Sequence, residues 1–177
     1  MESNLLIPQA SAIFQARLGE LIGSLELAIT GIKQQFNSRN LLYSTGTLMA
    51  IYERIDAAVI DMCKTATESV ILAHKAGNHR FTENLEGDLL DAFESNFSLG
   101  YTKLSALRAG SAQAILNGLS NKTMHENDNI LGEASRAKIE GQIALRHYFQ
   151  EVRKSQKRLY SYFYDIARLI LPFLKGR

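Results

Sequence analysis

Residue types that define several other protein classes are scarce in this chain of 177 residues. It has one cysteine, Cys63, so it cannot form an internal disulfide, and nothing in it suggests a cysteine-based metal site. Its two prolines, Pro8 and Pro172, lie near the ends and leave 163 residues between them without proline. Such an interval is compatible with long helices, and loop-rich β folds seldom have one.

Export signals and long hydrophobic runs are also missing. Residues 1–11 lack the basic start and apolar run of a secretory signal, so we expect a cytoplasmic protein. The longest apolar stretch, residues 159–174, is shorter than the roughly 20 residues that a membrane span needs. It also contains Asp165 and Arg168, which argues further against a transmembrane helix.

The composition fits one folded domain over residues 1–177. Hydrophobic residues make up 46% of the chain and charged residues 21%, both near the averages for globular proteins. A chain of this length can bury a substantial core without a second domain.

Apolar residues recur in alternating steps of three and four in four segments, at about residues 8–36, 44–76, 82–119 and 130–173. The stripes comprise Leu18, Ile22, Leu25, Ile29, Ile32 and Phe36; Leu48, Tyr52, Ile55, Val59, Met62 and Ala66; Leu90, Phe93, Phe97, Gly100, Leu104, Leu107, Ser111 and Ala114; and Leu145, Phe149, Val152, Gln156, Leu159, Phe163, Ile166, Ile170 and Phe173. The connections between the segments are short, so neighbouring helices should be antiparallel. The sequence therefore predicts an all-α fold, an elongated up-down-up-down four-helix bundle with coiled-coil-like packing.

Residues that favour helix ends flank these segments. Pro8 suits a first turn, because a proline there removes no helical hydrogen bond. Gly77 and Asn78 are typical of a C-terminal stop, and Thr82 is typical of an N-cap.

Motifs that carry catalysis or bind metals are not recognisable. A helical bundle that binds two metal ions through carboxylates needs Glu-x-x-His motifs, in which a Glu lies three residues before a His. No Glu lies three residues before His74, His79, His125 or His147. We place His147 on the outward face of the fourth helix, His79 and His125 in loops, and Cys63 among the small buried hydrophobic residues. No cofactor, metal or small-molecule substrate is expected. An enzyme whose site is assembled from scattered polar residues is the least favoured function.

Glycines inside a helical pattern require some compensation, because each costs about 1 kcal/mol relative to alanine. Gly19 and Gly23 lie four residues apart, on one side of the first helix. We expect another helix of the same chain to approach closely there, and we favour this over a groove for a partner.

Charge is distributed unevenly along the chain. Residues 133–177 contain ten basic and four acidic residues, whereas residues 83–94 contain five acidic residues and no basic one. The basic residues on the outer face of the fourth helix are Arg146, Arg153, Lys154, Lys157, Arg158 and Arg168. This face is either solvated or a binding surface for a polyanion, such as nucleic acid or acidic lipid.

The apolar face of the fourth helix widens after Leu159. A helix that is apolar on most sides has to be covered on most sides, and a chain terminus is hard to wrap with its own chain. We therefore expect an interface with a second copy or another protein at Tyr160, Phe163, Tyr164, Ile166, Ala167, Ile170, Leu171, Phe173 and Leu174. The function predicted first is a non-enzymatic interaction or scaffolding module, and the alternative is a polyanion binder.

Overall fold

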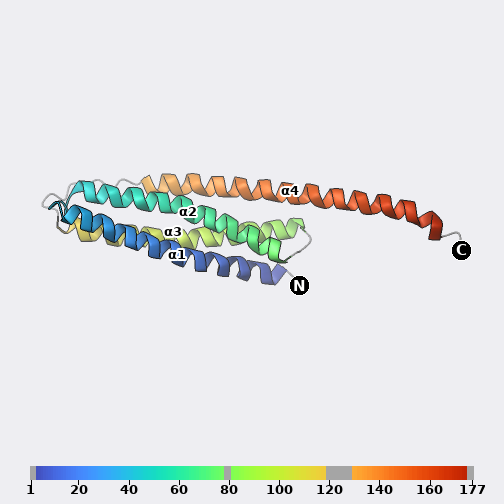
Figure 1. The fold of residues 1–177 in the computed structure, drawn as a ribbon, viewed down its shortest axis with the longest axis horizontal. Coiled ribbons are helices and arrows are strands. Elements are labelled where there is room, and N and C mark those ends of the chain that lie inside the picture. Colours follow the sequence, from blue (N-terminus) through green and yellow to red (C-terminus); the bar gives the residue numbers. More distant parts are fainter. Residues whose placement is uncertain (1–2, 78–80, 119–128, 175–177) are drawn as a thin grey trace.

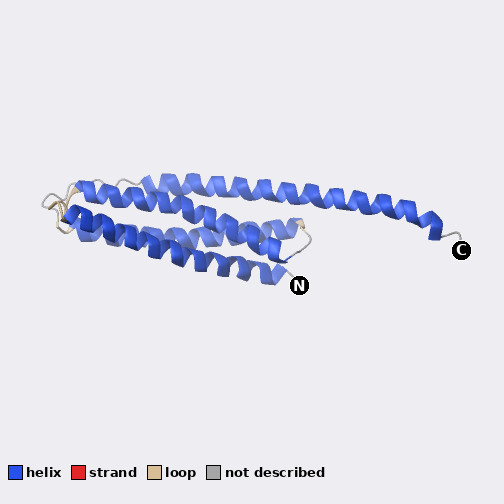
Figure 2. Cartoon of the chain, in the orientation of Figure 1, coloured by secondary structure: helices blue, strands red, loops and turns tan. Residues whose placement is uncertain are grey.

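A computed structural model describes residues 3–77, 81–118 and 129–174 of the chain. Within these ranges it contains four helices and no strand: α1 (Ser3–Asn37), α2 (Thr45–Gly77), α3 (Glu83–Leu116) and α4 (Asn129–Leu174). Successive helices run in opposite directions along one elongated bundle (Figure 1), and Figure 2 shows the same rod-like, helical architecture. The predicted all-α, up-down-up-down bundle is confirmed.

The four helices are not equivalent, because α2 packs against each of the other three. α1 also packs on α3, and α4 packs mainly on α2 and to a smaller extent on α3. Among the described residues α1 and α4 are not in contact. The pair α2 and α3 therefore separates them, and α4 has the smallest share of the common core.

The core follows the predicted stripes over part of their length. Leu18, Met62, Leu104 and Phe149, one predicted residue from each helix, are fully buried. Tyr52 and Leu90 are only partly buried, and the residues before them, Ile51 and Leu89, are buried instead. The stripe of α3 departs from the prediction at its end, where Ala114 is exposed and Ile115 is buried instead. The reason is that the helix takes a step of four after Ser111, not the step of three that we expected.

The start of α1 also differs from the prediction. The helix begins at Ser3, so Pro8 lies inside it and not in its first turn. Leu6, Ala10 and Phe14 are all buried and extend the apolar seam toward the N-terminus. Because a proline this close to the start removes only one backbone hydrogen bond, burial of Leu6 and Ala10 outweighs the loss.

The other predicted helix ends are confirmed as far as the structure describes them. The Thr82 hydroxyl accepts a hydrogen bond from the backbone N–H of Leu85 at 3.2 Å, which is the geometry of an N-cap. α2 ends at Gly77, while Asn78 lies outside the described residues.

Close contact between helices occurs at two glycines other than those we predicted. A Cβ atom at Gly19 or Gly23 would meet no atom within 4 Å, so the expected close approach of another helix there is wrong. A Cβ atom at Gly100 would lie 2.7 Å from the Met62 side chain, and one at Gly141 would lie 2.8 Å from Cys63 Sγ and 2.8 Å from the Phe93 ring. At Gly100 and Gly141, therefore, side chains of neighbouring helices occupy the space that a Cβ atom would need.

Candidate interaction surface

α4 is longer than its neighbours and extends past the end of the bundle (Figure 1). It has 46 residues, whereas α1, α2 and α3 have 35, 33 and 34. Within the described residues, the last ion pair and ring contact of α4 with another helix or its cap are made by Arg153, which pairs with Glu86 and lies over the Phe81 ring. Residues 154–174 follow, and at 1.5 Å per residue they span about 30 Å. We call them the α4 overhang.

The apolar seam of α4 continues into the overhang. In the bundle, Leu145 and Phe149 are 0% and 1% exposed. Leu159 follows Val152 by seven residues, or nearly two turns, and so lies on the same face, yet it is 56% exposed. The face is the same, but the helices that cover it have ended.

The predicted interface lies in this overhang. The backbone of residues 160–174 is helical. The side chains of the nine predicted residues, from Tyr160 to Leu174, lie outside the part of the chain that the structure describes. Their place on the helix is therefore known, and their contacts remain a prediction.

An aromatic cluster stabilises α4 where it leaves the bundle. The Tyr148 hydroxyl and His74 Nδ1 form a hydrogen bond of 2.8 Å. The rings of His74 and Phe81 meet edge-on at 5.7 Å, and those of Phe81 and Phe149 lie 5.1 Å apart. Burial raises the pKa of Tyr148, so its hydroxyl stays protonated. Because the cluster joins the end of α2 and the start of α3 to α4, it holds the direction in which the overhang projects.

Sequence reasoning missed this cluster. His74 and Tyr148 are 74 residues apart, and nothing in the local pattern of either residue indicates the other. The other histidines are placed as follows: His147 is exposed, as predicted, and His79 and His125 lie outside the described residues.

Ion pairs between α3 and α4 neutralise part of the uneven charge along the chain. Glu86 of α3 pairs with Arg153, and Glu94 pairs with Lys138 and accepts a hydrogen bond from Gln142, all on α4. The acidic start of α3 therefore lies against basic residues of α4, since the two helices are antiparallel.

The predicted basic face is therefore not uniform. Arg153 is held by Glu86, and Lys154 forms an ion pair of 2.8 Å with Glu151 on its own helix. Arg146, Lys157 and Arg158 are exposed, and the side chain of Arg168 lies outside the described residues. The side chains of Arg153 and Lys154 are also exposed, at 44% and 63%, so a polyanion would meet them with their acidic partners beside them.

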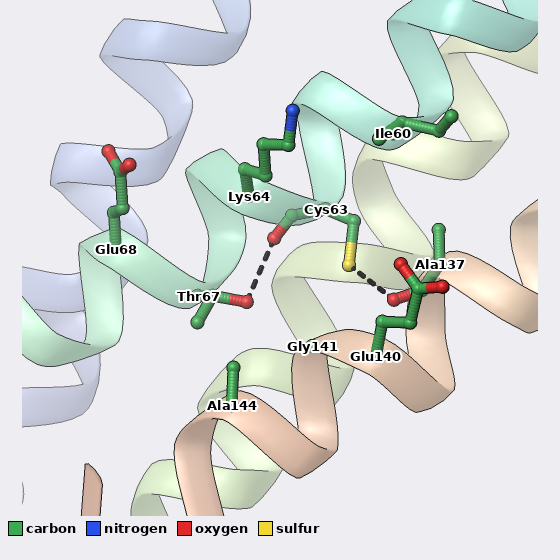
Figure 3. A pocket seen from close by; sticks show the side chains of 9 residues that line it. All are labelled: Ile60, Cys63, Lys64, Thr67, Glu68, Ala137, Glu140, Gly141 and Ala144. Atoms are coloured by element: carbon green, nitrogen blue, oxygen red, sulfur yellow. Dashed lines mark hydrogen bonds between the residues drawn. The ribbon is translucent and has the colours of Figure 1, made fainter. Parts of the chain in front are cut away.

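A shallow groove of about 290 Å³ runs between α2 and α4 (Figure 3). Its lining is mostly apolar and comprises Ile60, Cys63, Lys64, Thr67, Glu68, Ala137, Glu140, Gly141 and Ala144. Cys63 is buried, as predicted, and its Sγ donates a hydrogen bond to the backbone carbonyl of Ala137 at 2.9 Å. Burial raises the pKa of the thiol to about 11, so little thiolate forms near neutral pH. The groove therefore lacks an activated nucleophile.

One carboxylate is incompletely satisfied in the interior. Asp56 of α2 is half-buried, and its Oδ1 has no hydrogen-bond partner among the described residues. Burial raises the pKa of this carboxyl, while the nearby Arg108 guanidinium lowers it. In the described ranges, no three His, Cys, Asp or Glu side chains are grouped so that they could hold a metal ion.

No helix in the described part of the chain carries a stretch both long and apolar enough to cross a bilayer. Comparison of the chain with protein-family models, with curated proteins and with solved structures found no match.

Proposed function

We propose that this protein is a non-enzymatic helical-bundle module that self-associates or binds another protein through the α4 overhang. The observation that carries the proposal is the exposure of Leu159 at 56% on the face on which Leu145 and Phe149 are buried within the bundle. The sequence repeat continues this face through Phe163, Ile166 and Ile170.

Energetics support the same proposal. An isolated helix of about 20 residues is only marginally stable in water, because few of its side chains are packed. Burial of each large apolar side chain contributes roughly 1.5 to 3 kcal/mol. A partner helix along the seam would therefore stabilise the overhang and the complex together.

The test is the solution mass of the intact chain and of the variants Ile166→Glu and Ile170→Glu, measured by light scattering. The matched control is Ile143→Glu, because Ile143 is 57% exposed on α4 beside the bundle. We expect the intact chain and the control to exceed the monomer mass. The two overhang variants should be monomers whose bundle stays folded, so that helix content falls by no more than the share of the overhang. An assembly that survives both overhang substitutions would contradict the proposal.

Polyanion binding is the second candidate function. It is favoured by the exposure of Arg146, Lys157 and Arg158 on one helix. If it holds, binding to nucleic acid or acidic vesicles weakens steeply with added salt, because each neutralised phosphate releases counterions. The double variant Lys157→Glu with Arg158→Glu should abolish binding. Binding that persists in this variant would exclude the basic face.

A further inference from the structure

We infer that the α4 overhang pairs with the overhang of a second copy of this chain, antiparallel and seam to seam, so that the two bundles lie at opposite ends of the dimer. This inference rests on the proposed function and makes it specific, since it names both the partner and the geometry.

The bundle itself determines the direction in which a partner helix must run. On the seam side of α4, the space beside Ala134, Ala137, Leu145 and Phe149 is filled by α2 and α3. A second copy packed in parallel, seam against seam, would place its own α2 and α3 in that same space. An antiparallel copy has its bundle beyond the tip of the first overhang, away from α2 and α3 of the first copy. Parallel pairing is therefore blocked by the fold.

The length of the free seam also fits a second overhang. A partner helix on this face can extend for about 30 Å before it meets the end of the bundle near Arg153 and Phe81. The overhang of a second copy has this same length by identity. An isologous pair would cover both overhangs at once and leave neither seam exposed.

The register of the seam is compatible with antiparallel pairing. Phe163 and Ile166 are neighbouring seam positions, and Leu159 and Ile170 lie four residues before and after them. In an antiparallel pair centred between Phe163 and Ile166, Phe163 therefore lies opposite Ile166 and Leu159 lies opposite Ile170 of the other copy.

The area is sufficient for a stable dimer. The pair brings together ten seam side chains, five from each copy. At about 150 to 250 Å² for each aromatic side chain, the four phenylalanines of the pair account for about 600 to 1,000 Å², and the Leu and Ile side chains add to this area. Specific, stable interfaces bury about 1,200 to 2,000 Å².

The experiment that tests this geometry is disulfide cross-linking of two variants, Leu159→Cys and Ile170→Cys. Each is examined alone and in a mixture unfolded and refolded together, in a glutathione redox buffer. We expect a covalent dimer in the mixture and none from either variant alone, because position 159 of one copy faces position 170 of the other. The unmodified chain is the control, since its Cys63 is buried and should form no cross-link.

A second measurement does not depend on substitutions at the seam. Two helices of 46 residues that overlap by about 30 Å span about 110 Å, against about 70 Å for one α4. Small-angle scattering of the intact chain should therefore give a maximum dimension above about 110 Å, because α1, α2 and α3 extend beyond the start of α4 in each copy (Figure 1).

The opposing outcomes are distinct. Cross-links within Leu159→Cys alone would overturn the antiparallel geometry and leave association through the overhang intact. A monomer that forms no cross-links would overturn the inference and remove self-association from the proposed function, leaving only a different protein as partner. A dimer whose mass is unchanged by Ile170→Glu would overturn both.

Discussion

Replacement of Phe14 by alanine is expected to lower the free energy of unfolding by about 3 to 5 kcal/mol, because a fully buried ring is lost and a cavity remains. Phe14 is 0% exposed, and its ring tip lies 3.1 Å from the position that a Cβ atom at Gly100 would take. It therefore fills the space between α1 and α3 at their point of close approach. Urea denaturation followed by circular dichroism measures the loss.

The matched control for this variant is Leu27→Ala. Leu27 lies on the same helix, is also large and apolar, and is 75% exposed. Truncation there should change the free energy of unfolding by no more than about 0.5 kcal/mol. Equal losses at the two positions would mean that α1 is not packed as described.

Replacement of Gly141 by alanine should destabilise the protein, and the same replacement at Gly19 should stabilise it. A Cβ atom at Gly141 would lie 2.8 Å from both Cys63 Sγ and the Phe93 ring, so α4 must shift away from α2 and α3 at a cost of about 1 to 3 kcal/mol. At Gly19 the space is open, and alanine gains about 1 kcal/mol of helix propensity over glycine.

The two glycine variants are compared by thermal unfolding under identical conditions. The sign of the effect matters more than its size, because both proteins carry the same chemical change in the middle of a helix. If Gly141→Ala were as stable as Gly19→Ala, the close contact between α2, α3 and α4 would be refuted.

The helices themselves could be predicted from the sequence because their apolar repeat is long and regular. The stripe through Leu145 and Phe149 identifies the buried face of α4 whatever covers it. The repeat contains no information on which helix does the covering. The central position of α2, the pairing of Glu86 with Arg153 and the contact between His74 and Tyr148 all depend on that lateral arrangement. They were therefore not predictable.

The glycines illustrate the same limit. Gly19 and Gly23 form a spaced pair, which is the recognisable signal, but they face open space. Gly141 has no such partner in the sequence, yet side chains of α2 and α3 pack directly against it. A single glycine at such a contact can be recognised only when the position of the neighbouring helix is known. For the overhang, by contrast, the length of the fourth segment and its wide apolar face were visible in the sequence.

The reactivity of the Cys63 thiol reports on the packing of α4 against α2. Cys63 belongs to α2, but its thiol is bonded to the carbonyl of Ala137 on α4. Any motion that lifts α4 from its neighbours must break this bond and open the thiol to reagents in the solvent. The rate at which a thiol reagent alkylates Cys63 in the unmodified chain would therefore report the frequency with which α4 detaches, without any substitution.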